Sequence, residues 1–310
     1  MFLGLQDLAR QREYRKNLLI LPLLAFIVNL GFGAISAILP YFILYLAGSL
    51  KTLPEELGII QGASSYAVEF GTLMSLFMLT RAFLARYFGI YSDKIGRKKI
   101  IILGITLYTL VSFLYIVAPD LNWLYIIRML QGIASAMVWP VAEALLMDSV
   151  SHEVRGRAMG IYMAATTFSF VGGPAIGVGM YKIGVIYLGL REVGEALRFP
   201  FILLTALSLV SLALTFLLKE TLVKKEVEKA VQKTEKKIRL PKNVKRSVDA
   251  LYIIGFSNGV AMGLVAPFMM LYIVEYITSD PTALAIVSFI SGLAGIAATY
   301  PAGYLSDKIG

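Results

Sequence analysis

The chain has 310 residues, of which 58% are hydrophobic and 16% charged, with a formal net charge of +9 and no cysteine. Soluble domains have about 45–50% apolar and about 25% charged residues, so this composition excludes an ordinary soluble domain. The absence of cysteine also excludes disulfides, thiol catalysis and thiolate metal sites.

The apolar residues form runs long enough to cross a bilayer, which takes about 20 residues as a helix. In chain order the runs cover about 17–46, 68–90, 100–118, 123–147, 157–181, 199–218, 250–275 and 283–305. We therefore expect an all-α polytopic membrane protein with a six-helix N-terminal bundle and the first two helices of a second bundle. The amphipathic stretch 182–197 is expected to lie in the membrane interface instead of spanning it.

The positive charges alternate along the chain. Of the 29 Lys and Arg residues, 23 lie in the N-terminal arm, in 86–99, 149–157 and 219–246, and near residue 310. The loops between these segments hold only Lys51, Lys182, Arg191 and Arg198. This is the positive-inside pattern, which predicts a cytoplasmic N-terminus in a multi-pass protein of the plasma membrane. The basicity is thus topological, and no nucleic-acid partner is expected.

Two phrases of the sequence are nearly repeated. "GAISAILPYFI" (33–43) resembles "GVAMGLVAPFMM" (259–270), and Gly89-Ile-Tyr-Ser-Asp-Lys-Ile-Gly96 resembles Gly303-Tyr-Leu-Ser-Asp-Lys-Ile-Gly310. From the proline of the first phrase to the start of the other phrase, the first copy of the repeat is 13 residues longer than the second copy. We place these additional residues in the outer loop 49–65. The repeat predicts an N-terminal transporter half at 1–218, a charged cytoplasmic linker at 219–247 and an incomplete C-terminal half at 248–310. Parallel repeats of this kind are a transporter architecture.

Four motifs resemble those of the major facilitator superfamily. The phrase at 89–99 is similar to its signature in the loop between helices 2 and 3, with Lys94 where Arg is usual. Three further stretches, in the fourth span, the loop after it and the fifth span, are similar to other family motifs in the same order. The residues concerned are Gly89, Asp93, Lys94, Gly96, Arg97 and Lys98; Arg128 and Gln131; Asp148, Arg155 and Arg157; Gly173, Pro174 and Gly177; and, in the second copy, Gly303, Asp307 and Gly310.

The resemblance implies twelve helices, of which this sequence supplies eight, arranged as two halves that alternate access to a central cavity. It implies that the loop at 89–99 is a latch holding one of two conformations, and that the Gly-Pro motif is associated with antiporters. From chemistry alone, Asp93 can pair with Arg97 or Arg155, or cap a neighbouring helix. The simpler alternative is that these charges set topology and form ion pairs worth about 0–1 kcal/mol each.

Charged side chains inside the spans are the candidates for coupling. Arg128 lies inside the fourth span, where a charge costs at least about 2.5–3.5 kcal/mol. The resemblance implies proton coupling or helix–helix bonding for it, with Gln131 one turn below, and snorkelling is the alternative. Glu143 lies about 22 Å along the helix from Arg128, so we predict that it pairs with Arg81 instead. The first span offers only Asn29 as a strongly polar side chain, which leaves Glu143 as the proton carrier by elimination.

These features predict a secondary transporter, not an enzyme, that exports small amphipathic molecules in exchange for protons, within a lipid bilayer. Phe268, Met269 and Met270 could form a soft wall of its cavity. No cofactor, metal or catalytic residue is expected. Two alternatives remain open: a transport-inactive, truncated product of a longer gene, and a facilitator or uptake permease for sugars or other metabolites.

Overall fold

The computed structural model describes residues 14–151, 154–221 and 268–309, together with positions 246, 250, 253, 254, 257 and 265. In the last helix, the side chains of 295, 296 and 298–309 are outside this description. Most of the predicted linker, most of the seventh predicted span and Gly310 therefore lie outside the described residues.

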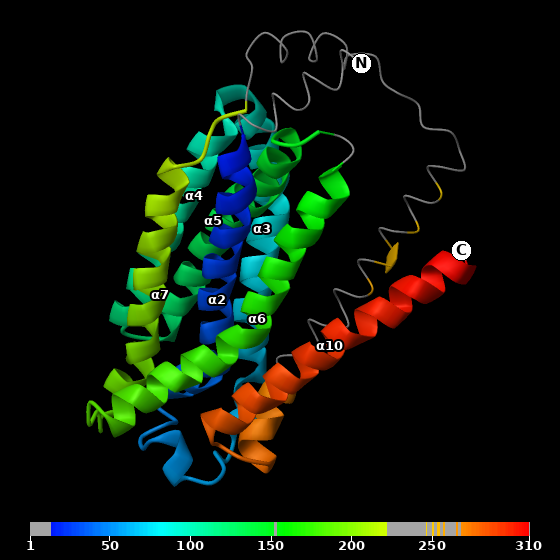
Figure 1. Ribbon diagram of the computed structural model, residues 1–310. Helices are drawn as coiled ribbons and strands as arrows, with labels where there is room; N and C mark the ends of the chain where they lie inside the picture. The colour runs from blue at the N-terminus through cyan, green and yellow to red at the C-terminus, as the bar shows by residue number, and fades with distance from the viewer. Residues whose placement is uncertain are drawn as a thin grey trace, which may run out of the picture.

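The described residues form helices joined by short connections (Figure 1). They are α2 (Arg15–Leu46), η1 (Pro54–Glu56), η2 (Ala63–Tyr66), α3 (Ala67–Ile95), α4 (Arg97–Val117), α5 (Leu121–Asp148), α6 (Arg155–Ile186), α7 (Val193–Phe216) and α10 (Pro281–Ile309). Residues 268–276 are also helical. In this part of the chain, six helices, α2 to α7, are long and apolar enough to cross a membrane. The predicted all-α polytopic fold is confirmed.

Helix boundaries follow local chemistry. Gly96 separates α3 from α4 with φ of +114°, a backbone conformation that L side chains rarely adopt. The Asp120 carboxylate caps α5 by accepting from the amides of Asn122 at 2.8 Å and Trp123 at 3.2 Å. These two residues explain why the chain reverses where the apolar runs are interrupted.

Residues 182–197 do not form a span of their own: helix α6 continues to Ile186 and α7 already begins at Val193, with a tight turn between them. That this stretch lies in the membrane interface stays a prediction. The amphipathic pattern arises because Val193, Ala196 and Leu197 are buried against the core while Arg191 and Glu192 face outward at the turn.

Helix α2 lies at the centre of the bundle and packs mainly against α6 and α7, whereas α5 packs against α3 and α4 (Figure 1). The α2–α6 contact depends on glycine. A Cβ at Gly173 would lie 2.6 Å from the Gly33 Cα, and one at Gly177 would collide with the backbone of Ala34. The Gly-Pro motif of α6 is therefore the surface that lets two backbones touch.

We call the end of the bundle with Arg15, Arg97 and Phe216 the inner end, and the opposite end the outer end, after the predicted orientation. The connection 47–66 and the start of α10 lie together at the outer end (Figure 1). From there α10 runs along α6 and then away from the six-helix bundle toward its Ile309 end (Figure 1). The first six helices thus form one packed unit, which α10 touches mainly along α6.

Candidate functional site

The predicted latch forms an ion-pair network at the inner end. The Arg97 guanidinium donates Nη2 to the Asp93 carboxylate at 3.1 Å and Nη1 to the Ala144 carbonyl at 3.1 Å. The same Nη1 pairs with the Asp148 carboxylate. Arg97 is mostly buried, with 14% of its side chain exposed. One side chain at the start of α4 therefore ties down the ends of α3 and α5.

Glu220 completes this network, although the sequence motifs did not indicate it. Its carboxylate accepts from the backbone amides of Arg97 at 3.2 Å and Lys98 at 3.0 Å, which have no partner inside α4. A Cβ at Gly96 would lie 2.5 Å from the Glu220 Oε2. Gly96 is thus required twice, for its backbone angle and for the approach of this carboxylate.

The end of α7 is tied to the rest of the inner end by Asn17. Its amide donates to the Ser149 hydroxyl at 2.9 Å and to the Lys219 carbonyl at 2.9 Å, and its carbonyl accepts from the Lys219 amide at 2.8 Å. The Lys98 ammonium donates to the Phe216 carbonyl at 2.7 Å. We refer to Asn17, Asp93, Arg97, Asp148 and Glu220 as the inner node. Glu220 and Asn17 could have been noticed as the polar residues that border two apolar runs.

Other members of the predicted latch lie outside these contacts. A Cβ at Gly89 would meet nothing within 4 Å, so this glycine makes no close helix approach within the described residues. Lys94 and Arg157 are exposed. Of the two partners considered for Asp93, the structure shows Arg97 and not Arg155. Gly303 and Asp307 lie in α10, but the side chain of Asp307 is outside the description.

Arg128 is buried in α5, about 10 Å from the start of the helix at 1.5 Å per residue and with 2% of its surface exposed. Its Nη1 donates to the Gln131 side-chain carbonyl at 2.9 Å, and the Tyr115 hydroxyl donates to the same oxygen at 3.1 Å. No carboxylate of the described residues lies within ion-pair distance of Arg128. The cation is therefore held inside the bundle by a neutral partner, Gln131, which lies one turn further along α5.

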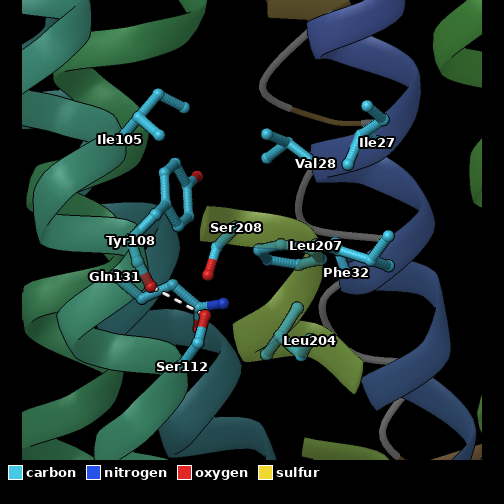
Figure 2. A pocket seen from close by; sticks show the side chains of 10 residues that line it. All are labelled: Ile27, Val28, Phe32, Ile105, Tyr108, Ser112, Gln131, Leu204, Leu207 and Ser208. Atoms are coloured by element: carbon cyan, nitrogen blue, oxygen red, sulfur yellow. Dashed lines mark hydrogen bonds between the residues drawn. The ribbon is translucent and has the colours of Figure 1, made fainter. Parts of the chain in front are cut away.

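Gln131 also borders a hollow inside the bundle, of about 350 Å³ when the space at its mouth is counted (Figure 2). Its walls come from α2, α4, α5 and α7. The lining residues are Ile27, Val28, Phe32, Ile105, Tyr108, Ser112, Gln131, Leu204, Leu207 and Ser208. The hollow lies within the first six helices, so it is distinct from a cavity between two halves.

The predicted Arg81–Glu143 ion pair is not formed. No ion pair or hydrogen bond within the described part of the chain joins their side chains, although each charge acts electrostatically on the other. The two side chains come from α3 and α5 and both are half-buried. Helices α3 and α5 run side by side, and Gly132 of α5 packs against Thr80 and Arg81 of α3. Because Glu143 follows Gly132 along α5, it lies nearly three turns from Arg81 toward the inner end.

One buried hydroxyl interacts with this carboxylate. The Tyr162 hydroxyl of α6 is buried without a hydrogen-bond partner among the described residues, and it interacts electrostatically with Glu143 and Arg81. Phe268 and Met269 are exposed, whereas Met270 packs against the core. Within the described residues, no group of three or more His, Asp or Glu could hold a metal ion.

Helices long and apolar enough to cross a membrane, with the Arg128 cation buried inside the bundle, indicate a polytopic membrane protein. The chain belongs to the Major Facilitator Superfamily, whose model matches residues 21–310. The proteins of this family are membrane transporters and not enzymes.

Two curated relatives carry names that refer to drug resistance. Multidrug resistance protein 2 of Bacillus subtilis is 28% identical over 234 residues, which are 74% of this chain and 50% of that protein. The quinolone resistance protein NorA of Staphylococcus aureus is 26% identical over 169 residues, 54% of this chain and 39% of that protein. The chain spans about half the length of the curated relatives that it matches.

Solved structures show the same fold. A bacterial homolog of the human lysosomal transporter Spinster, in an inward-facing and unoccupied conformation, superposes with a TM-score of 0.63 at 17% identity. The match covers 96% of this chain and 63% of that one. At this identity the similarity describes the fold alone.

Proposed function

We propose that this chain is part of a proton-coupled exporter of small amphipathic molecules that works by alternating access. It lies in the plasma membrane with its N-terminus in the cytoplasm. In this arrangement residues 1–218 are the first half, 219–247 a cytoplasmic linker and 248–310 the beginning of the second half. Export is favoured by the relatives, whose names refer to resistance to multiple drugs and to quinolones.

The observation that carries proton coupling is the Glu143 carboxylate. It lies within α5, half-buried, and has no ion pair or hydrogen bond to the described residues. A carboxylate in an apolar environment with no compensating partner is stabilised by taking up a proton. Arg81 acts on it from a distance and limits that tendency. Glu143 can therefore exchange a proton when its surroundings change between conformations.

Arg128 has a different role in this proposal. Since its guanidinium is bound to Gln131 and through it to Tyr115, it is a fixed positive charge inside the unit. A fixed cation favours the charged form of a carboxylate or of an anionic substrate group that approaches it. Arg128 and Gln131 thus provide a fixed positive potential for an anionic substrate group, about 22 Å along α5 from Glu143.

The inner node serves as the latch. Arg97 pairs with Asp93 and Asp148, and its amide donates to Glu220. These contacts hold the ends of α3, α5 and α7 around the start of α4. A conformational change that moves the loop at 89–99 must break charge-assisted hydrogen bonds, which are stronger than neutral ones. The node therefore stabilises one arrangement of the inner end over another.

The test is transport in vesicles that contain the chain, with a fluorescent amphipathic cation as the substrate probe. We expect an imposed pH gradient to drive accumulation of the probe at least about tenfold above empty vesicles, and Glu143→Gln to abolish that dependence because the amide cannot titrate. Glu192→Gln is the control, since Glu192 is an exposed acidic residue directly before α7 and is expected to retain the gradient dependence.

Equal probe flux with and without the gradient in the unsubstituted chain would contradict proton coupling and favour a facilitator. No flux under any condition, from protein that is folded and inserted, would favour the transport-inactive alternative. Gradient-driven flux that survives in Glu143→Gln would assign the proton to another group.

A further inference from the structure

The outer connection 47–66, where the repeat carries its additional residues, is bonded to the second repeat unit. Four hydrogen bonds link it to residues 274–279. Two join backbone groups: the Ile60 amide donates to the Val274 carbonyl at 3.1 Å, and the Ser279 amide donates to the Gly58 carbonyl at 2.8 Å. The other two use side chains: the Ser64 amide donates to the Glu275 carboxylate at 2.6 Å, and the Ser279 hydroxyl donates to the Pro54 carbonyl. The connection belongs to the first unit in sequence but is attached to the second in space.

The same connection reaches α6 through polar side chains, and its buried apolar residues are part of the core that contains Tyr181 of α6 and Val274 of the second unit. The Glu55 carboxylate accepts from the Tyr181 hydroxyl at 2.7 Å and lies 3.4 Å from the Lys182 ammonium. That ammonium also lies 3.5 Å from the Asp280 carboxylate, directly before α10. One cation of the first unit is thus shared by two carboxylates, one from the connection and one from the second unit.

We infer that Glu55, Lys182 and Asp280 form an outer clasp that closes the outer end of the protein, and that the two units part there when the outer end opens. The three side chains retain partial contact with water, with 23%, 27% and 44% of their surfaces exposed. Ion pairs at such sites are weak and reversible, unlike hydrogen bonds buried in a core. A weak shared cation suits a contact that must break in every cycle.

The backbone permits the connection to move with the second unit. Gly48 and Gly62, with φ of +78° and +76°, bracket the part of the connection that contains Glu55, and a Cβ at either would meet nothing within 4 Å. They are suitable pivots because glycine changes backbone conformation without steric penalty. On the other side of the clasp, α10 meets α6 as far as Gly292, whose added Cβ would lie 2.5 Å from Val171.

The charge of Asp280 supports this assignment. Partial burial acts to raise the pKa of its carboxyl, but the hydrogen bonds from Thr282 and the charge of Lys182 outweigh that effect and lower the pKa overall. The carboxylate is therefore ionised at neutral pH and available to the clasp. Tyr41 of α2 interacts electrostatically with both Asp280 and Glu55.

The test measures the separation across the clasp directly. The chain has no native cysteine, so spin labels can be attached to Tyr187→Cys after α6 and Ile277→Cys before α10, both exposed positions. Pulsed EPR then gives the distribution of distances between the labels. In this background we expect Lys182→Gln to raise the long-distance fraction about three- to tenfold, because two weak ion pairs are lost and two carboxylates are left facing each other.

Two substitutions act as controls. Lys51→Gln removes an exposed cation of the same connection that has no ion pair with the described residues, and it should leave the distribution unchanged. Lys182→Arg keeps the charge and should also resemble the unsubstituted protein. If Lys182→Gln does not fold, Glu55→Gln and Asp280→Asn each remove one pair and should raise the long-distance fraction about two- to threefold.

If Lys182→Gln gives the same distance distribution as Lys51→Gln in folded protein, the inference is overturned. The same holds if Glu55→Gln and Asp280→Asn both give the distribution of Lys51→Gln. An equal shift in Lys182→Arg would also overturn it, because the effect would then not depend on charge. The measurement needs no transported substrate. Failure of the proposed proton-coupled export would therefore leave the outer clasp untouched, and failure of the outer clasp would leave the proposed export untouched.

Discussion

The inner node and the outer clasp are both networks of charged side chains at an end of the bundle, but they connect different things. The inner node joins α2, α3, α4, α5 and α7, all in the first unit, and uses helix ends and backbone groups as partners. The outer clasp joins the first unit to residues 274–280 and depends on three side chains and a docked connection.

The difference indicates where movement is possible. At the inner node Arg97 is mostly buried and Glu220 satisfies amides that would otherwise lack partners, so breaking these contacts exposes several groups at once. At the outer clasp each ion pair can be replaced by water at little cost. The described residues thus combine one rigid six-helix unit with an outer junction whose ion pairs are weak and whose remaining contact with the first unit is apolar packing.

The largest expected effect comes from breaking the rigid unit itself. Gly173→Val forces a side chain against the Gly33 backbone, where a Cβ would lie only 2.6 Å away. We expect a loss of about 1–3 kcal/mol in the free energy of unfolding, measured by chemical denaturation in detergent. Gly172→Val is the control, because its Cβ would meet nothing within 4 Å, and it should change stability by less than about 0.5 kcal/mol. Equal losses in both would contradict the close α2–α6 contact.

Removing the cap at the inner node comes next. Glu220→Ala leaves the amides of Arg97 and Lys98 without their carboxylate partner and should lower the free energy of unfolding by about 1–2 kcal/mol. The control is Glu192→Ala, since Glu192 is exposed and makes no side-chain capping hydrogen bond. Thermal unfolding in detergent would show the difference. A shift for Glu192→Ala as large as that for Glu220→Ala would refute the capping role.

A finer comparison concerns the two carboxylates that share Arg97. Asp93 has 56% of its side chain exposed and Asp148 has 35%. Because screening by water weakens the more exposed pair, Asp148→Asn should cost about 1 kcal/mol and Asp93→Asn about half of that. Added salt should reduce the second loss more than the first. The reverse ranking would show that Asp93 makes the stronger contact.

The smallest effect is the pH dependence of the outer clasp. The pKa of Asp280 lies below its ordinary value of 3.8, so the contribution of this carboxylate is complete above that value and is lost as the pH falls through the lowered pKa. The distance distribution between the labels at positions 187 and 277 should therefore stay constant from about pH 7 to about pH 5. The long-distance fraction should rise only below about pH 4, where free aspartate takes up protons. A rise already at about pH 6 would contradict the lowered pKa.

The sequence determined the helices, their number within the first unit and the family. Periodic apolar runs of this length can be satisfied only as membrane helices, because a bilayer leaves no partner for unpaired backbone groups. The loop motif also indicated that Asp93 has a cationic partner nearby, and Arg97 is that partner. Such features are local, since they depend on residues a few positions apart.

The tertiary structure decided which distant residues meet. Glu220 reaches the start of α4 from 122 positions away along the chain, and Asp280 finds Lys182 across the two units. The Arg81–Glu143 pair failed for the same reason: the register between α3 and α5, fixed by the packing of Gly132, separates the two side chains by nearly three turns. Composition and spacing specify what each helix is, whereas only the packing of one helix on another specifies which charges are neighbours.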